Sequence, residues 1–298
     1  MKVLVTGASG FLGSRVTRLL LQKGICTTAL DLVPCVNEDC EFLQCDITDS
    51  DGLAATLHGH SFDSVIHLAG IRGSIEQMNR MNVIGTSVLA ETLSTHCGSM
   101  VMASSCSVYG IPVSSSGLVT ETDRTAPVTP YGCTMLEKER SASRICHHSR
   151  MTLCIARLFN LFGPGQSCEM MVQSMAEKLR AILSGVASPP LKTGPLHTER
   201  DLIDVDDAAS ALVGIAVAEA SGVFNVGTGI PRSGAYVLNA LQHEMGTNFP
   251  VEASSGSSCD VLKIYADITH IHESIGWEPE KSFSSTIRAV VEQLNSVR

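Results

Sequence analysis

Two hydroxyl-bearing segments of this chain have the residue types needed to move a proton. Pro130 and Tyr131 begin a helix predicted over residues 131–147, so the phenol faces the positive end of the helix dipole. That position favours the phenolate and eases proton exchange with a substrate hydroxyl. Ser104 and Ser105 follow the strand predicted over residues 100–103, and a serine there could hold the same hydroxyl. The combination suits hydride transfer at a secondary alcohol or ketone, in which a nicotinamide exchanges the hydride and Tyr131 the proton.

A glycine-rich segment near the start of the sequence indicates where such a cofactor would bind. The strand predicted over residues 3–6 passes directly into Gly7, Gly10 and Gly13. Closely spaced glycines between a strand and a helix bring backbone N–H groups up to a pyrophosphate. The next predicted strand, residues 25–30, ends at Asp31, whose carboxylate would accept hydrogen bonds from ribose hydroxyls and repel a 2′-phosphate. The segment predicts NAD in preference to NADP; the alternative is a tight turn with an aspartate that caps a loop.

The elements that must position these residues alternate along the chain. Strands are predicted over residues 3–6, 25–30, 42–45, 64–67, 100–103 and 152–156, and helices over residues 14–23, 51–58, 76–97 and 131–147. Alternation of this kind predicts an α/β fold, a doubly wound parallel (Rossmann) sheet with ligands at the carboxyl ends of the strands. After about residue 159 short strands and helices predict a smaller substrate-binding lobe. We expect an NAD-binding domain over residues 1–158 and this lobe over residues 159–298, with parts returning to the first domain.

Composition excludes several classes of protein. The chain has 298 residues, 44% of them hydrophobic, which is enough to bury a large core, and its net charge of −9 argues against a nucleic-acid partner. No apolar run reaches bilayer-spanning length, and residues 1–6 have no leader character, so a cytoplasmic protein with no membrane partner is expected. The 11 cysteines are scattered without a CxxC pair, which favours reduced thiols over disulfides or a metal site.

Beyond these patterns, the chain resembles a known family over nearly its whole length. The matching segments, in family order, are residues 6–13, Asp31, Asp46-Ile47, residues 67–70, residues 82–86, Ser104-Ser105, residues 108–110, residues 130–132, residues 157–160, residues 163–165, residues 200–207 and residues 225–229. They resemble the extended short-chain dehydrogenase/reductase family, also called the NAD-dependent epimerase/dehydratase family. Within it the resemblance is strongest to the branch that reduces or epimerises nucleotide-bound hexoses, so a small-molecule substrate, a nucleotide-diphosphate sugar, is implied.

The resemblance implies a role for each matching residue. Catalysis would fall to Ser105, which orients the substrate, and Tyr131, the general acid/base. The cofactor-binding set would be Gly7, Gly10, Phe11, Leu12, Gly13, Asp31, Asp46, Ile47, Leu68, Ala69, Gly70, Asn82 and Tyr131. The glycines would hold the pyrophosphate, Asp31 the ribose and Asp46-Ile47 the adenine. Substrate contacts would come from Ser105, Asn160, Arg200 and Arg232, and a guanidinium suits a diphosphate.

The catalytic region departs from the family at one position. The family has a lysine four positions after the tyrosine, where it lowers the pKa of the phenol and binds the nicotinamide ribose; here that position is Met135. Lys138 and Arg140 follow Tyr131 by seven and nine positions, and by helical rise alone both lie ~10 Å or more away, so neither is expected to substitute. Three explanations remain open: an engineered change that traps a ligand-bound state, a natural enzyme that uses another cation or water, or a silent binding protein.

Two further departures concern substrate binding. The interval from His67 to Asn82 is shorter than in the family, which implies a smaller or more open active site. A second phosphate-binding arginine expected near residues 256–261 is absent, so diphosphate recognition would depend on Arg200 with help from Arg232.

Several other polar residues are expected to be structural. His67 at a strand end is interpreted as packing a loop or neighbouring the cofactor, because Tyr131 already supplies the acid/base group. Tyr109 ends its loop instead of opening a helix and is interpreted as structural. The pair His147 and His148 is predicted to be a solvated pair near a helix end, with no metal site.

Two functions are therefore compatible with the sequence. The first is an NAD-dependent nucleotide-sugar epimerase, dehydratase or 4-ketoreductase acting at the sugar C4. The second is a non-catalytic NAD-binding member of the same family, favoured by Met135. The resemblance also implies a homodimer built from the helices that begin near Glu76 and Tyr131.

Overall fold

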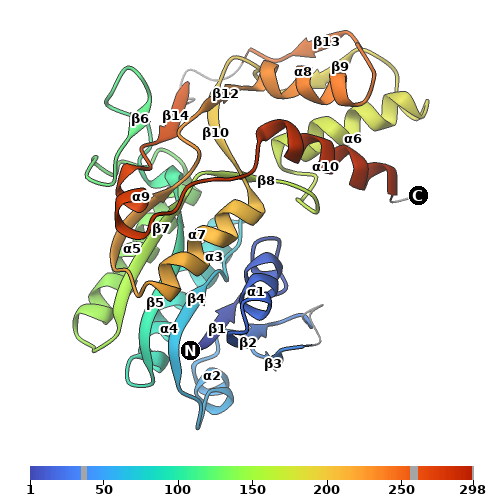
Figure 1. Ribbon diagram of the computed structural model, residues 1–298. Coiled ribbons are helices and arrows are strands. Elements are labelled where there is room, and N and C mark those ends of the chain that lie inside the picture. The colour runs from blue at the N-terminus through green and yellow to red at the C-terminus, as the bar shows by residue number, and fades with distance from the viewer. Residues whose placement is uncertain (35–38, 256–260, 297–298) are drawn as a thin grey trace.

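The computed structural model describes residues 1–34, 39–255 and 261–296, and its centre is a parallel sheet of seven strands. The strands in chain order are β1 (Lys2–Thr6), β2 (Cys26–Asp31), β3 (Glu41–Gln44), β4 (Phe62–His67), β5 (Cys97–Ser105), β7 (Thr152–Leu158) and β11 (Gly222–Val226). Their spatial order is β11-β7-β5-β4-β1-β2-β3, and all neighbours pair in parallel. The order reverses between β1 and β4, which is where a doubly wound sheet binds ligands. The predicted α/β Rossmann architecture is confirmed (Figure 1).

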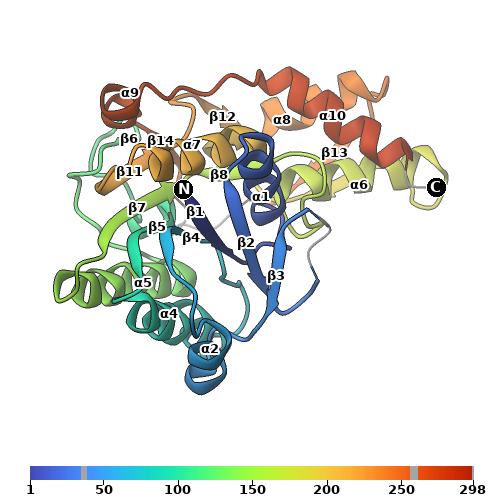
Figure 2. The same ribbon diagram turned by 60° about the horizontal axis from the view of Figure 1, so that its bottom comes forward.

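Helices cover both faces of this sheet. The helices α1 (Gly13–Gln22) and α7 (Val205–Val217) pack on one face, where Val3 and Val5 of β1 point. Leu4 of β1 points to the opposite face. The helices on that face are α2 (Ser50–Thr56), α4 (Thr86–Leu93) and α5 (Pro130–His147). Figure 2 shows the two helical layers on either side of the strands. Successive β1 side chains thus alternate between two apolar cores, as a sheet buried on both faces requires.

The helix predicted over residues 76–97 is divided into three parts. A short α3 (Ile75–Met78) leads into a π-helical segment η1 (Asn79–Gly85), and α4 then ends at Leu93. The wider π turn carries the buried Asn82, whose Oδ1 accepts from Ile71 N at 2.8 Å and whose Nδ2 donates to Ile71 O at 3.0 Å. The apolar period along the sequence cannot distinguish i→i+5 from i→i+4 bonding. The predicted helix was therefore too regular and too long.

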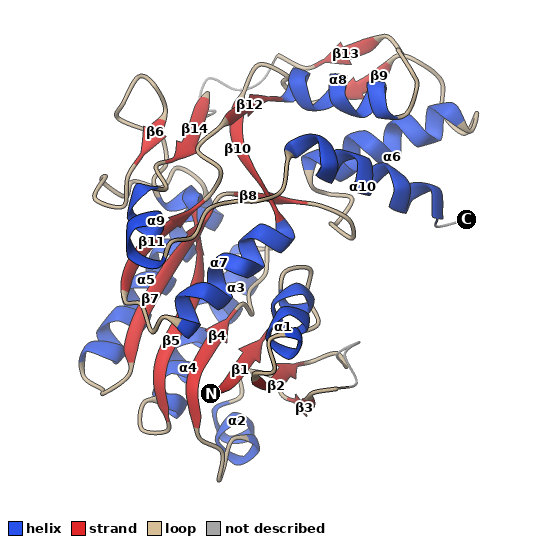
Figure 3. Ribbon diagram, in the orientation of Figure 1, coloured by secondary structure: helices blue, strands red, loops and turns tan. Residues whose placement is uncertain are grey.

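A second layer lies above the carboxyl ends of the large sheet (Figures 1 and 3). Its strands are β6 (Leu118–Val119), β8 (Asn160–Phe162), β10 (Glu199–Asp204), β12 (Pro231–Ser233) and β14 (Lys263–Ala266), ordered β12-β10-β14-β6 with β8 beside β10. A separate pair joins β9 (Leu191–Thr193) to β13 (Val251–Ala253). The helices α6 (Met171–Leu183), α8 (Gly234–Glu244) and α10 (Phe283–Ser296) enclose a third apolar core. Two short helices, η2 (Cys106–Val108) and α9 (Thr269–Ile275), complete the fold.

The chain passes from the large sheet to the second layer after β7 and later returns. Both α7 and β11 come from the part of the sequence after residue 159, yet they pack on the large sheet. We propose the domain division at residues 158 and 159, with α7 and β11 as the returning parts. No helix in the three described ranges is both long enough and apolar enough to cross a bilayer.

Candidate active site

The loop between β1 and α1 leaves no room for side chains at its glycines. Gly7 has a φ of +69°, and a Cβ built there would lie 2.7 Å from Ala69 N. A Cβ on Gly13 would lie 2.0 Å from Gly7 O. Gly7 N donates to Leu30 O at 3.0 Å, which ties the loop to β2. The result is a cradle of bare backbone at a helix start, and it fits the pyrophosphate of a dinucleotide.

Two aspartates line a cavity of about 210 Å³ beside this cradle. Asp31 at the end of β2 accepts from Ser9 N at 3.0 Å and Leu32 N at 2.7 Å. Asp46 accepts from the backbone N and the hydroxyl of Thr48, both at 2.8 Å. Each carboxylate has lone pairs that these backbone and hydroxyl donors do not use. It can therefore stabilise its turn and still accept a hydrogen bond from a ligand hydroxyl. Asp31 therefore does shape its loop, as the alternative interpretation had it, and also lines the cavity.

A larger cavity of about 450 Å³ opens from the same glycines at the carboxyl ends of the strands. Among the predicted site residues it is lined by Gly7, Gly10, Phe11, Leu12, Gly13, Leu68, Gly70, Asn82, Ser105, Tyr131, Met135 and Asn160. The smaller cavity takes Asp31, Asp46, Ile47 and Ala69. A third cavity, of about 380 Å³, shares Asn160 with the large one and adds Arg200. The structure thus brings together, in three adjoining cavities, every predicted site residue except Arg232.

Arg232 lies apart from these cavities. Its guanidinium carbon is 4.7 Å from the centroid of the Phe283 ring, and Nη1 donates to Ile230 O at 3.4 Å. It is paired across β10 and β12 with Arg200, so the two arginines are neighbours on the ladder. Its contact with a substrate stays a prediction. The region near residues 256–261, where a second arginine was expected and not found, falls outside the described residues except for Val261.

Tyr131 and Ser105 face the large cavity from different elements. Thr129 caps α5 by accepting from Gly132 N at 3.0 Å, which fixes the first turn that carries Tyr131. Ser105 ends β5 and accepts from Ser107 N at 3.2 Å. Burial raises the pKa of the Tyr131 phenol, while the charge of Arg72 and hydrogen bonds to Ser105 and Arg72 lower it. Desolvation therefore outweighs the lowering expected from the helix start.

Met135 and Lys138 follow Tyr131 on the same side of α5. Both line the large cavity and are 5% and 2% exposed. Lys138 Nζ donates to Ala69 O at 3.5 Å. The predicted separation of ~10 Å or more considered helical rise alone. It left out that helical side chains point back toward the N-terminus and that a lysine is long, which is how the Lys138 side chain reaches the cavity that Tyr131 also lines. Arg140 is exposed and pairs with Glu137 at 3.8 Å.

Sequence reasoning missed two cations, Lys178 in the third cavity and Arg72 in the large one. Arg72, in the loop after β4, lines the large cavity with its guanidinium carbon 4.2 Å from the centroid of the Tyr131 ring. Nothing in the local sequence distinguishes this exposed arginine from others. Its one signal was the short interval between His67 and Asn82, which keeps the loop close to the cavity.

His67 and Tyr109 occupy structural positions. The fully buried His67 has Nδ1 2.7 Å from Thr6 Oγ1 and Nε2 2.8 Å from Thr86 Oγ1. Burial and the nearby Lys138 hold the His67 pKa well below its usual value, so the ring is neutral and joins β4 to β1 and α4. Tyr109 donates to Asn225 Oδ1 at 2.6 Å, away from the cavity lining.

The sequence also matches the profile of the NAD dependent epimerase/dehydratase family over residues 3–227. The chain belongs to this family. The predictions of an NAD-dependent enzyme family and of NAD as its cofactor are thereby confirmed, and the residues that would hold NAD are those of the glycine cradle and the two cavities beside it.

Two relatives and one solved structure show what the chain is similar to. The dTDP-6-deoxy-L-talose 4-dehydrogenase (NAD(P)(+)) of Kitasatospora kifunensis is 29% identical over 96% of this chain and 93% of that protein. A UDP-glucose 4-epimerase of Neisseria meningitidis serogroup C is 28% identical over 95% and 94%. The structure of MoeE5 in complex with UDP-glucose and NAD has a TM-score of 0.88 with 28% identity, over 99% of each chain.

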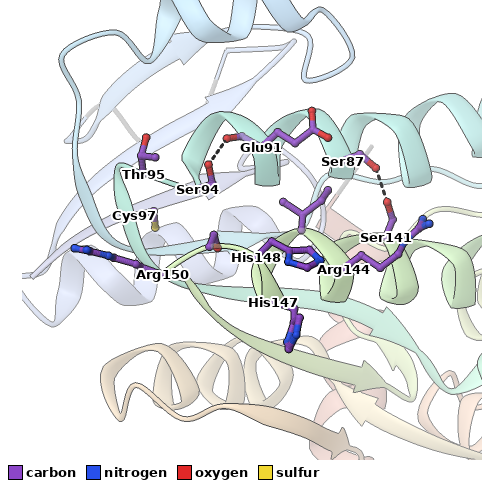
Figure 4. Close-up of a pocket in the computed structure, with 12 residues that line it drawn as sticks. Ser87, Glu91, Ser94, Thr95, Cys97, Ser141, Arg144, His147, His148 and Arg150 are labelled. Atoms are coloured by element: carbon purple, nitrogen blue, oxygen red, sulfur yellow. Dashed lines mark hydrogen bonds between the residues drawn. The ribbon is translucent and has the colours of Figure 1, made fainter.

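A further hollow, of about 1060 Å³, lies on the surface between the ends of α4 and α5 (Figure 4). Its walls carry serines, arginines and the pair His147 and His148. Two hydrogen bonds are made by its lining residues. Ser94 Oγ donates to Glu91 O at 2.7 Å at the end of α4, and the hydroxyls of Ser87 on α4 and Ser141 on α5 are 2.6 Å apart. None of the predicted site residues lines it, so its size does not make it the candidate active site.

Proposed function

We propose that this protein is an NAD-dependent nucleotide-sugar epimerase, dehydratase or 4-ketoreductase that acts at the sugar C4. The observation that carries the proposal is that the Tyr131 phenol and the Ser105 hydroxyl line the same cavity as the glycine cradle. NAD, when bound, supplies the hydride acceptor or donor. Gly7, Gly10 and Gly13 bind the pyrophosphate, and Asp31 and Asp46 orient the adenosine end.

The proton-transfer chemistry falls to Tyr131 and Ser105. The Ser105 hydroxyl holds the oxygen on the sugar C4. Tyr131 Oη accepts the proton of that hydroxyl as C4 loses a hydride, and returns it when the 4-ketone is reduced. General acid/base catalysis by a positioned side chain contributes ~10²–10⁴-fold to rate.

The adjoining cavity supports a diphosphate-bearing substrate. Arg200 and the exposed Lys178 both line it, and Lys178 Nζ also donates to Lys192 O at 3.1 Å. Asn160 lies on the wall that it shares with the catalytic cavity, so one substrate could reach from the cations to Tyr131. Cationic donors that line one cavity suit phosphate oxygens. UDP- and dTDP-sugars are the first substrates to try, because the named relatives carry those nucleotides.

The test is a panel of UDP-, dTDP- and GDP-sugars, assayed for sugar products and for NADH absorbance. Tyr131→Phe should lower activity by ~10²–10⁴-fold even when NAD is saturating. Tyr236→Phe is the matched control, because Tyr236 is exposed on α8 and should leave activity unchanged. An active protein that is indifferent to Tyr131→Phe would refute the proton-transfer assignment.

Met135 supports a second candidate, a non-catalytic NAD-binding member of the family. Its thioether neither carries charge nor donates a hydrogen bond. If the unaltered chain turns over none of the sugars and Met135→Lys creates activity, the chain is an enzyme inactivated by the replacement of the family lysine. If both are silent while NAD stays bound, the non-catalytic function holds.

We further propose a homodimer through the helices that begin near Glu76 and Tyr131, here α3 with η1 and α4, and α5. Both α4 and α5 present exposed polar side chains around the hollow of Figure 4. Sedimentation at micromolar concentration should give a dimer, and a monomer at every concentration would refute this.

A further inference from the structure

Lys138 is a buried cation that the proposed chemistry has not used. It is 2% exposed, and among the described residues its one hydrogen bond is the 3.5 Å contact from Nζ to Ala69 O. An ammonium has three donors, so most of its hydrogen-bonding capacity is unmet. Burying such a group without partners costs free energy that a core methionine would not cost. A ligand that brings acceptors into this cavity would offset that cost.

The position of Lys138 on α5 aims it at the cavity. Tyr131, Met135 and Lys138 are spaced i, i+4 and i+7, so they share one face of the helix. All three line the cavity that also contains Gly7 and Asn82. Lys138 therefore brings donors to a wall where Met135, one turn nearer Tyr131, has none.

We propose that the Lys138 ammonium is an anchor for the bound dinucleotide, donating hydrogen bonds to its ribose hydroxyl oxygens in this cavity. The inference rests on the proposed function only in taking the ligand to be NAD. Lys138 serves as a positioning residue. Its side chain extends to the ligand from a backbone position one turn further along α5 than Met135.

The charge on Lys138 then depends on the ligand. Burial lowers the pKa of Lys138 to about 7, and the neighbouring Glu139 raises it only in part. The other titratable groups around it are the neutral His67 on β4 and three that line the same cavity: Tyr131 on its own helix, the uncharged Cys106 thiol and the Arg72 guanidinium. Of the charged groups, only Glu139 acts on the Lys138 pKa. Hydroxyl acceptors stabilise the ammonium, so NAD binding should raise the Lys138 pKa and take up a proton from solution above pH 7. Affinity for NAD should correspondingly fall as pH rises from about 7.

The experiment is calorimetric titration with NAD between pH 6 and pH 9, in two buffers of different ionisation enthalpy. The unaltered protein should take up protons on binding above pH 7. Lys138→Met should lose that uptake and bind NAD about tenfold or more weakly. The double variant Lys138→Met with Met135→Lys returns an ammonium to the same face and should recover affinity. Arg140→Met, on an exposed site of the same helix, is the control and should change neither quantity.

The outcomes separate the two proposals. If Lys138→Met binds NAD with unchanged affinity and unchanged proton uptake, the anchor is refuted while the proposed function stands. If the unaltered chain binds no NAD, the proposed function itself fails. If Tyr131→Phe leaves sugar turnover intact but Lys138→Met weakens NAD binding, the anchor stands and the catalytic assignment falls.

A second inference follows independently from Arg72. Its guanidinium carbon lies 4.2 Å from the Tyr131 ring centroid, and the loop after β4 carries it over the cavity. Cys106, which also faces Tyr131, is an uncharged thiol because burial raises its pKa to about 12. Arg72 is therefore the cation whose charge acts on the phenol, with Ser105 as a hydrogen-bonding neighbour.

We also propose that the Arg72 guanidinium stabilises the negative charge that forms on Tyr131 during proton transfer. A fixed opposite charge within ~4–6 Å favours the ionised form of an acid by about 1–3 in pKa. The delocalised guanidinium can also stack on the aromatic ring while it does so.

The ionisation of Tyr131 can be followed directly, because the chain has only 4 tyrosines. Ultraviolet absorbance titration of the chain, minus that of Tyr131→Phe, isolates this phenol. Arg72→Met should raise the Tyr131 pKa by about 1–3, and Arg72→Lys should restore part of the difference. Arg124→Met, on an exposed loop, is the control. An unchanged Tyr131 titration in Arg72→Met would overturn the inference, whatever happens to sugar turnover.

Discussion

The two neighbouring residues Lys138 and Glu139 are both buried on α5, but their surroundings differ completely. Glu139 is 4% exposed and meets Arg157 twice, with Arg157 Nε 3.1 Å from Oε1 and Nη2 2.9 Å from Oε2. Ser104 donates to the same carboxylate at 2.5 Å. Lys138, about 100° around the helix from Glu139, has the single long bond to Ala69 among the described residues. One buried charge is fully paired and the other is not.

The effect of burial on pKa follows this difference. Burial by itself lowers the pKa of Arg157, but the hydrogen bonds and charge of Glu139 outweigh it, and the pKa of Arg157 is raised. For Lys138 burial prevails, because Glu139 already faces Arg157. A paired buried charge holds the fold together. An unpaired one at a cavity wall indicates a site for a ligand.

The strongest effect is expected on the paired side. Glu139→Gln leaves the Arg157 guanidinium buried without its carboxylate and should destabilise the protein by ~3–5 kcal/mol. Urea unfolding measures this. The control is Glu137→Gln, whose exposed pair with Arg144 at 3.5 Å should contribute less than ~1 kcal/mol. Equal effects from the two variants would remove the distinction between the two sides of α5.

Lys138→Met should raise the free energy of unfolding of the unliganded protein, whereas Glu139→Gln lowers it. Removing a buried, unpaired ammonium should stabilise it by roughly 1–3 kcal/mol at pH 7, the desolvation cost of a buried polar group whose hydrogen bonds are unmet. The pKa of Lys138 is about 7 in the folded protein and 10.5 for an ordinary lysine, so between these pH values the unfolded chain binds more protons and stability rises with pH. The gain from Lys138→Met is therefore largest below pH 7 and fades toward pH 10.5. Thermal unfolding across that window checks this; a loss of stability at pH 7 would contradict it.

A smaller effect is expected where the paired network reaches β11. Tyr109→Phe removes the hydroxyl that donates to Asn225 at 2.6 Å and accepts from Arg157 Nη1 at 3.1 Å. Asn225 and Arg157 would each lose a buried hydrogen bond, which should lower the free energy of unfolding by about 1–3 kcal/mol. Affinity for NAD, measured by calorimetry, should stay within experimental error. A marked loss of NAD affinity would show that Tyr109 belongs to the site after all.

The smallest effect is expected in the hollow between α4 and α5. Arg144 is exposed there in a single subunit, and Arg144→Ala should change the stability of the monomer by no more than ~0.5 kcal/mol and its NAD affinity not at all. Urea unfolding and calorimetry, at a concentration where sedimentation shows the monomer, test this. A change in NAD affinity would mean that the hollow communicates with the cofactor cavities.

Residues that act through the backbone were predictable from sequence. The spacing of Gly7, Gly10 and Gly13 predicts a close approach of the main chain to a ligand. Asp31 directly follows a buried strand, so its place at the carboxyl end of the sheet was also predictable. Local periodicity also gave the first six parallel strands. These features depend on neighbours within a few residues, and local signals suffice for them.

Residues that act through long side chains were not predictable in the same way. Rise per residue located the Lys138 backbone correctly but said nothing of where its side chain leads, and Arg72 depends on how a loop folds over a distant helix. The π turn that sets Asn82 escaped for a related reason, since one extra residue in a turn leaves the apolar pattern almost unchanged.

The last strand to join the large sheet has a consequence for biosynthesis. β11 pairs with β7 from Gly222↔Cys154 to Val226↔Leu158, and it is the outermost strand. On the ribosome, the edge of β7 keeps its backbone N–H and C=O groups unpaired until residue 226 has emerged. Truncated chains that end before residue 222 should therefore associate through that edge and be cleared by chaperones and proteases.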